Sequence, residues 1–303
     1  MIPFVREFDF AWGRRDPVSP LIQRVICENP GPFTFTGTGT YIVGRPDPGA
    51  EVAVIDPGPL DEAHLKALLA AVEGRRVSHV LVTHTHRDHA PLARPFAAAV
   101  GNPPILAMRP PAHETHASGR LDEDEAEAFA PDLILSGGER IAGDGWTLTA
   151  MATPGHASNH MSFALAEENA LFSGDHVMGW ATSVVAPPDG DMADYMRSLD
   201  AVIAGGFATL WPTHGAPVTE PEPFLRALHA HRLEREAQVL ARVVTGERTI
   251  GSMVPELYAA VDPGLWPAAS LSVLAHLIKL VNEGRVAVEG GGPAAMDSLY
   301  GAG

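Results

Sequence analysis

The heptapeptide Thr83-His84-Thr85-His86-Arg87-Asp88-His89 carries the strongest structural signal in this chain. It continues the apolar run of residues 78–83, which predicts a buried strand. Because side chains alternate along an extended chain, His84 and His86 can reach the same cation through neutral imidazole nitrogens. Asp88 and His89, in the turn beyond, can reach a second cation nearby. We therefore expect a metal site at the C-terminal edge of a strand, facing a cleft built by loops.

Three later residues are candidates for completing this site. His156, Asp175 and His214 each end an apolar, strand-like run, and each has a glycine next to it that would let the backbone bend tightly around an ion. A lone histidine is seldom a ligand. A dense cluster followed by three such residues is hard to explain as a chance run of polar residues in a loop.

Composition limits the classes of function. The chain has 303 residues, 46% of them hydrophobic and 19% charged, which is typical of a well-packed globular protein. Its formal net charge of −16 argues against broad binding of nucleic acids, which requires many Lys and Arg residues facing phosphates. The single cysteine, Cys27, cannot form an intramolecular disulfide, and we expect it to be packed and inert.

The first residues and the apolar runs bear on localisation. Residues 1–18 lack the apolar core of a signal peptide. We also read no apolar run as long enough to cross a bilayer. The expectation from sequence is therefore a cytoplasmic protein without a membrane contact.

The first 222 residues read as one domain of short strands and few helices. Residues 61–72 have helical apolar spacing, and Asp61 can cap their first turn. The acidic segment 120–131 is expected to be a solvated loop or an exposed helix face. Strands are expected in the apolar, turn-bounded runs 40–43, 51–56, 78–83, 146–151, 161–165, 171–175 and 209–211.

The composition changes after Pro223, so residues 223–303 are expected to form a second, α-rich module. Helical patterns cover residues 224–244, 249–261 and 267–282, and a strand is expected at 285–288. Three helices followed by a short β-wing are winged-helix-like. The Gly-rich residues 290–303 are expected to be a loose tail.

The ligand pattern resembles that of the metallo-β-lactamase superfamily, in which a His-x-His-x-Asp-His motif is followed by a His, an Asp and a final His. The resemblance implies an α/β fold, an αββα sandwich with the site at one edge of two packed sheets. It also implies that Asp56 orients the ligand loop from behind. The implied first metal is held by His84, His86 and His156, the second by Asp88, His89 and His214, and Asp175 bridges them.

Segments outside this motif resemble the beta-lactamase-like protein 2 subgroup. They are residues 29–34, 37–41 and 194–199, together with the winged-helix-like end. That subgroup contains animal endoribonucleases and many bacterial hydrolases of unassigned activity. The likeness therefore informs the architecture more than the substrate.

The ligand set predicts hydrolytic chemistry. Two Zn²⁺ ions per chain suit it best, with iron or manganese as alternatives. Two such ions lower the pKa of a bridging water and give a hydroxide that attacks a carbonyl carbon or a phosphorus, while Asp88 relays a proton. His160, His176 and Tyr195 are the candidate substrate contacts.

Three functions compete on the sequence alone. The first is hydrolysis of a small-molecule ester, thioester or lactam. The second is cleavage of single-stranded RNA, with the winged-helix-like segment as the binding module. Its basic residues are interspersed with Glu234, Glu236, Glu247 and Glu283, so no clean basic face is legible. Those basic residues are Arg232, Arg235, Arg242, Arg248, Lys279 and Arg285.

The third function is a non-catalytic, metal-stabilised interaction protein. A purely structural site would not need a water-accessible pair of ions, which counts against it. Homodimer formation, the native metal and the physiological substrate are not determined by the sequence.

Overall fold

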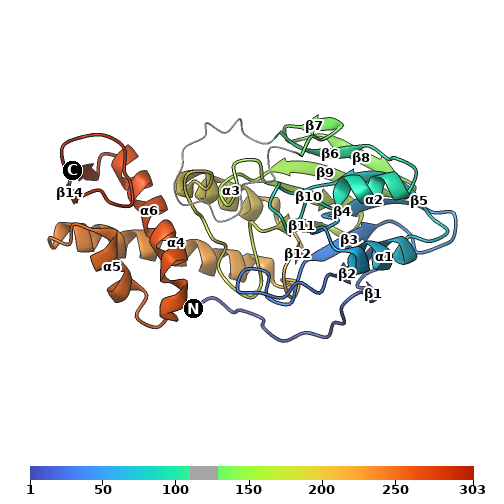
Figure 1. The fold of residues 1–303 in the computed structure, drawn as a ribbon, viewed down its shortest axis with the longest axis horizontal. Helices are drawn as coiled ribbons and strands as arrows, with labels where there is room; N and C mark the ends of the chain where they lie inside the picture. The colour runs from blue at the N-terminus through green and yellow to red at the C-terminus, as the bar shows by residue number, and fades with distance from the viewer. Residues whose placement is uncertain (110–128) are drawn as a thin grey trace.

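The computed structural model describes residues 1–109 and 129–303, and the acidic segment predicted at 120–131 falls largely outside these ranges. Within them, two sheets face each other, with helices on their outer sides (Figure 1). The larger sheet has 7 strands, ordered as they occur in the chain. They are β1 (Arg15–Pro17), β2 (Ile22–Ile26), β3 (Gly39–Val43), β4 (Glu51–Ile55), β5 (Arg76–Leu81), β6 (Ile105–Met108) and β7 (Leu133–Leu135).

The smaller sheet has 5 strands in the described residues, in the order β12-β11-β10-β9-β8. Its outermost pair, β11 and β12, is parallel, and the remaining pairs are antiparallel. The 3-10 turn η2 (Ala166–Glu168) connects β10 to β11. The strands are β8 (Arg140–Gly143), β9 (Trp146–Ala152), β10 (Met161–Leu165), β11 (Ala170–Gly174) and β12 (Thr209–Pro212).

Three apolar layers hold the sandwich together. The layer between the sheets contains Tyr41, Trp146 and Phe172. A second layer joins the outer face of the larger sheet to α1 (Glu62–Ala71) and α2 (Ala93–Ala99). A third joins the smaller sheet to α3 (Met192–Gly205) and to the start of α4 (Pro221–Val244). The expected αββα sandwich is confirmed.

The predicted helix at 61–72 is present as α1, and it begins where the sequence places its cap. The Asp61 carboxylate accepts a hydrogen bond from the backbone N–H of His64 at 2.6 Å. This contact satisfies one of the amide groups that a helix N-terminus leaves unpaired.

Cys27 is buried, as expected, and burial raises the pKa of its thiol to about 12.

The C-terminal module lies at one end of the molecule, and the long helix α4 runs from it to the sandwich (Figure 1). Its own apolar core joins the second half of α4 to α5, α6 and the wing. The Phe224 end of α4 packs instead with Tyr195 and Leu199 of α3. Besides α4, the module contains α5 (Ile250–Leu257), the 3-10 turn η3 (Pro263–Leu265), α6 (Trp266–Asn282), β13 (Val286–Val288) and β14 (Tyr300–Ala302).

The prediction of a loose tail at 290–303 is wrong. β14 pairs antiparallel with β13, so these residues close the wing. The Tyr300 ring is fully buried in the module core, and its hydroxyl donates to the carbonyl of Ala295 at 2.6 Å. Glycines suggest a disordered end by composition, but one buried aromatic residue anchors the segment.

One helical segment differs from the expectation about membranes. Residues Pro263–Asn282 are long and apolar enough to cross a bilayer by length and composition alone. In the structure, however, α6 buries Val273, Leu277 and Leu280 in the module core. Its Lys279 side chain reaches Glu236 of α4 at 2.8 Å. Its apolar character is therefore accounted for by packing within the module.

Candidate metal centre

All seven residues expected to be ligands lie at strand ends on one edge of the sandwich. The run from His84 to His89 follows β5, His156 follows β9, Asp175 follows β11 and His214 follows β12. Gly155 and Gly174, beside two of them, have positive φ values of 136° and 53°, which glycine adopts without strain. A side chain at Gly155 would also clash with the backbone of Tyr195, since an added Cβ would lie 2.3 Å from its Cα.

Three histidines form the first group. His86 Nδ1 lies 2.8 Å from His84 Nε2 and 3.1 Å from His156 Nε2. The opposite nitrogen of His156 donates to the carbonyl of Val184 at 2.6 Å, which leaves Nε2 as the lone-pair nitrogen that faces the other two. These three atoms can hold one metal ion.

Asp88, His89 and His214 form the second group. Asp88 Oδ2 lies 3.0 Å from His214 Nε2 and 3.4 Å from His89 Nε2. Asp175 lies between the two groups, because its carboxylate oxygens are 3.8 Å from His156, 3.5 Å from His214 and 3.6 Å from His89. The structure therefore brings together all seven side chains, with Asp175 placed to serve both positions.

Burial and crowding set the protonation of these groups in the absence of an ion. Burial and the neighbouring His156 lower the pKa of His86 to about 4. Burial would also lower the pKa of His214, but Asp175 and Asp88 raise it to about 10. The same carboxylates raise the pKa of His89 well above its ordinary value.

The donor set fits divalent cations on an observation independent of the motif. His89 Nε2, His214 Nε2 and Asp175 Oδ1 are buried without a hydrogen-bond partner in the described part of the chain. Such atoms cost free energy unless something binds them. Histidine nitrogens and carboxylate oxygens are ligands that zinc and related cations accept. A bound cation would give these atoms the missing partner, and His89 and His214 would hold it through unprotonated Nε2 atoms.

Asp56 supports the ligands from behind, where its side chain is 1% exposed. Its carboxylate accepts hydrogen bonds from the backbone and hydroxyl of Thr83, at 2.7 and 2.8 Å, and from Thr213 at 3.0 Å. It also lies 2.9 Å from His89 Nδ1, which turns His89 Nε2 toward the centre.

The two threonines were missed at the sequence level. Each directly precedes a ligand, in the repeated dipeptides Thr83-His84 and Thr213-His214. That repetition was the available signal. Together with Asp56 they join the ends of β5 and β12, which come from different sheets.

The three candidate substrate contacts are buried beside the site, away from the cavity lining. His160 Nε2 accepts a hydrogen bond from the backbone N–H of Asp175 at 3.1 Å, and its other nitrogen contacts Thr153 at 2.8 Å. The Tyr195 hydroxyl donates to the carbonyl of His176 at 3.0 Å. All three side chains are fully buried, so in this structure they shape the strand ends that carry the ligands and do not touch the cavity.

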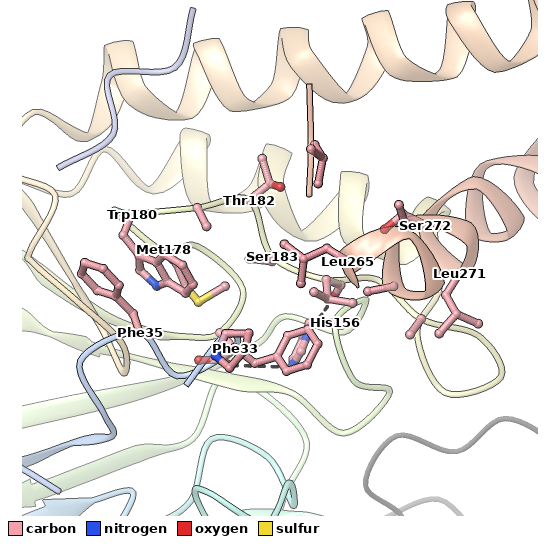
Figure 2. A pocket seen from close by; sticks show the side chains of 18 of the residues that line it. Phe33, Phe35, His156, Met178, Trp180, Thr182, Ser183, Leu265, Leu271 and Ser272 are labelled. Atoms are coloured by element: carbon pink, nitrogen blue, oxygen red, sulfur yellow. Dashed lines mark hydrogen bonds and ion pairs between the residues drawn. The ribbon is translucent and has the colours of Figure 1, made fainter. Parts of the chain in front are cut away.

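A cavity of about 660 Å³ opens over the ligands. His86, Asp88, His156 and Asp175 form its polar floor. In Figure 2, Phe33 and Leu265 lie near His156, Phe35 and Trp180 lie together on one side of the pocket, and Leu271 lies on the other side, which belongs to the module. Phe35 and Trp180 stack with ring centres 4.7 Å apart. The sandwich and the C-terminal module therefore build one largely apolar cavity together.

A loop between β11 and α3 connects the module to the ligands. Arg232 of α4 donates a hydrogen bond to the carbonyl of Ser183, and the next carbonyl, of Val184, accepts from His156. The Arg232 guanidinium also lies 4.8 Å from the centre of the Tyr195 ring. This contact could not be predicted from the sequence, because it links residues that are far apart in the chain.

Comparisons with known proteins agree with this geometry. Residues 34–214 match the family described as Metallo-beta-lactamase superfamily, and residues 249–293 match the Beta-lactamase associated winged helix domain. An atrochrysone carboxyl ACP thioesterase from Claviceps purpurea (strain 20.1) is 31% identical over 80% of this chain and 74% of its own length. A beta-lactamase-like protein 2 homolog from Caenorhabditis elegans is 30% identical over 89% of this chain and 88% of its own length.

Solved structures show the same fold. A beta-lactamase domain protein from Burkholderia ambifaria aligns with a TM-score of 0.80 and 20% identity, covering 100% of this chain and 97% of that one. This likeness covers the winged-helix end as well as the sandwich.

Proposed function

The chain belongs to the metallo-beta-lactamase superfamily and is an enzyme, and from that premise we propose that it is a two-metal hydrolase of acyl thioesters. One observation carries the proposal. Four ligand-type side chains, His86, Asp88, His156 and Asp175, form the floor of a largely apolar cavity of about 660 Å³, and His84, His89 and His214 lie against them. That volume lies in the range of small-molecule sites.

The residues that would hold the metals are the two groups described above, with Asp175 between them. When bound, a pair of divalent cations supplies Lewis acidity and brings the pKa of water close to neutral pH. Zinc is the proposed metal, since imidazole and carboxylate ligands suit it.

Asp88 is the proposed proton carrier. Its side chain is 25% exposed and lines the cavity, whereas the ligand histidines His89 and His214 are fully enclosed. In thioester hydrolysis, the oxygen of water forms a bond to the acyl carbon and the carbon–sulfur bond breaks. Asp88 accepts the proton released by water and passes it to the leaving sulfur, which departs as a thiol.

The apolar walls favour a thioester with a bulky acyl group. Phe33, Phe35 and Leu265 offer the acyl part a surface without hydrogen-bonding demands. The relatives named as thioesterases, from Claviceps purpurea and from Aspergillus fumigatus (33% identical over 78% of this chain), support this substrate class over a lactam.

The test is a hydrolysis screen on one zinc-loaded preparation. Phenylacetyl thioester, oxygen ester and amide of matched shape are compared, alongside a chromogenic cephalosporin. We expect the thioester to have the highest kcat/KM. A matched control is His229→Gln, because His229 lies on α4 outside the cavity lining and contacts Asp200 at 3.2 Å. Thioester turnover no faster than in zinc alone would contradict the proposal.

Cleavage of single-stranded RNA is the second candidate, supported by the likeness to the beta-lactamase-like protein 2 homolog. The module's basic residues weigh against it. Arg242 pairs with Glu247 and Arg248 with Glu289, while Lys279 and Arg285 both pair with Glu236. Of the six basic residues named above, these pairs leave Arg232 and Arg235 without an ion pair in the described residues, which is too few for an extended phosphate backbone. Metal-dependent cutting of an unstructured RNA, abolished by Asp88→Ala, would favour this candidate instead.

A non-catalytic interaction protein is the remaining alternative. It predicts no turnover of thioesters, esters, lactams or RNA by metal-loaded protein. The exposed Asp88 and the open cavity count against it, because a structural metal site is normally closed.

A further inference from the structure

Two of the seven Lys and Arg residues in the module differ from the other five. Arg226, Arg242, Arg248, Lys279 and Arg285 are held in ion pairs with glutamates. Arg232 and Arg235 form no ion pair within residues 1–109 and 129–303. Both instead line the cavity above the ligands. Three residues apart on α4, they present two guanidinium groups on the same side of the helix.

Arg232 is the more unusual of the two, because it is 4% exposed. One of its terminal nitrogens donates to the Ser183 carbonyl, while its Nε has no hydrogen-bond partner in the described part of the chain. A buried cation is costly unless a negative charge lies close to it. The Ser183 carbonyl satisfies one N–H group but does not neutralise the charge.

Arg235 adds a second cation at the same wall. Its guanidinium lies 4.3 Å from the centre of the Tyr258 ring and donates to the carbonyl of Leu257, at the end of α5. His231, which also lines the cavity, has its pKa lowered to about 4 by burial and by these two arginines. The wall is therefore positively charged in a protein whose net charge is −16.

The acidic residues of the cavity do not compensate this wall. Those that line it are Asp88 and Asp175, which belong to the metal centre, and Asp189, which accepts hydrogen bonds from Ser158. Among the described lining residues, Arg232 and Arg235 on the module side therefore have no carboxylate partner. On the floor, the carboxylates of Asp88 and Asp175 contact histidines.

We propose that Arg232 and Arg235 bind an anionic oxygen group of the substrate, so that the enzyme prefers thioesters carrying a carboxylate or phosphate at a distance from the scissile carbonyl. This inference rests on the proposed thioester hydrolysis and names its substrate class. The anionic group and the scissile carbonyl occupy one cavity, and the Ser183–Val184 turn lies between Arg232 and the ligand His156. Binding at the arginines would therefore set the distance of the acyl carbon from the metal centre.

The experiment compares three thioesters with zinc-loaded protein. The first is an N-acetylcysteamine thioester of an aryl-containing dicarboxylic acid with a free distal carboxylate. The second is its distal methyl ester, which has no charge, and the third is the coenzyme A thioester of that methyl ester. The variants are Arg235→Gln, Arg232→Lys and the matched control Arg226→Gln, an exposed α4 arginine paired with Glu222 at 3.0 Å.

We expect wild-type protein to prefer an anionic thioester over the neutral one by roughly 10- to 100-fold in kcat/KM, the usual range for a charge-assisted hydrogen bond. The preference should fall toward unity in Arg235→Gln, fall partly in Arg232→Lys, and persist in Arg226→Gln. A preference for the free carboxylate assigns the anion to the acyl part. A preference only for the coenzyme A thioester assigns it to the carrier's phosphates.

A binding measurement separates this inference from the proposed function. Calorimetric titration with 4-phenylbutyrate and with 4-phenylbutyramide requires no turnover. Tighter binding of the carboxylate, lost in Arg235→Gln and kept in Arg226→Gln, supports the arginine site even if thioesters are not hydrolysed. Equal binding of acid and amide, or an acid preference that survives in Arg235→Gln, overturns it even if thioesters are hydrolysed.

Discussion

Two clusters in this molecule bury a carboxylate among basic groups, and they differ in what their polar atoms face. In the module, Glu236 is 7% exposed and meets Lys279 at 2.8 Å and Arg285 at 2.9 Å. Both of its oxygens have protein partners. In the metal centre, Asp175 is similarly buried, but its Oδ1 has no hydrogen-bond partner in the described residues. The Nε2 atoms of His89 and His214 also lack a hydrogen bond there, although Asp88 Oδ2 lies 3.4 and 3.0 Å from them.

We infer from this difference that the Glu236 cluster stabilises the fold of the module, whereas the Asp175 cluster binds metal ions. Glu236 joins α4 to α6 and to the residue before the wing, so its charges are neutralised by the chain itself. Asp175 and its neighbours are held in place by outer contacts, such as those of Asp56 and His160, while their inner atoms stay available. Substitutions in the two clusters should therefore affect different measurements.

The largest effect is expected for Asp88→Ala. It removes both a ligand and the proposed proton carrier, so kcat for thioester hydrolysis should fall by about 100- to 10,000-fold. Steady-state kinetics with a fixed, saturating zinc concentration measure this change. The thermal midpoint of the metal-free protein should stay within a few degrees of wild type, and a kcat within threefold of wild type would contradict the proposed role.

A smaller effect is expected for Asp56→Ala, which touches no ion and no substrate. Losing the carboxylate leaves Thr83, Thr213 and His89 without their common acceptor. Support of this kind is worth about 10- to 100-fold in metal affinity or activity. Zinc affinity measured by competition with a chelator should show the loss, and Asp56→Asn should recover part of it. Unchanged zinc affinity in both variants would contradict the claim that Asp56 positions the metal ligands.

Glu236→Gln should change stability and its pH dependence. Burial would raise the pKa of Glu236, but hydrogen bonds and charges from His276, Lys279 and Arg285 lower it to about 2. A depressed folded-state pKa stabilises the fold above the unfolded value and loses that contribution as the pH falls from about 4.5 to about 2. Because Arg285 is partly exposed, the contribution is about 1–2 kcal/mol.

Denaturant titrations at several pH values test this prediction. The free energy of unfolding of the Glu236→Gln variant should lie below that of wild type at pH 7, and the gap should narrow between pH 4.5 and pH 2. Carboxylates common to both proteins cancel in the comparison. A gap that stays constant across this window would mean that the ionised form of Glu236 does not stabilise the module.

The smallest effect is expected at the surface. Arg248 and Glu289 form an ion pair in which both side chains are about half exposed. Exposed pairs of this kind contribute less than about 1 kcal/mol. Arg248→Gln should therefore leave unfolding and thioester turnover nearly unchanged. A loss as large as that of Glu236→Gln would show that burial does not separate the two kinds of pair.

The metal centre could be predicted from the sequence, because its ligands either lie close together in the chain or follow predicted strands. His84, His86, Asp88 and His89 lie within six positions, in the loop and turn that follow β5. Strand-like alternation predicted that they converge, although β5 itself ends at Leu81. The later ligands each close an apolar run beside a glycine. The sandwich and the three module helices followed from the same kinds of pattern.

The cavity and the Glu236 cluster could not be predicted from the sequence, because they depend on contacts between elements that are far apart in the chain. Arg232 and Ser183 are 49 positions apart, as are Glu236 and Arg285. In the sequence, acidic and basic residues alternate throughout the module. Only the folded structure shows which basic residues form ion pairs and which face the cavity. Tyr300 shows the same limit, since a single buried ring orders a Gly-rich end.

The most direct test of the two-metal account is a zinc titration of metal-free protein, with bound zinc and thioester turnover followed in the same sample. Turnover should rise until two zinc ions are bound per chain and then stay constant, and Asp175→Ala should neither bind both ions nor turn over. Full turnover at one ion per chain, or retained turnover in Asp175→Ala, would contradict the account.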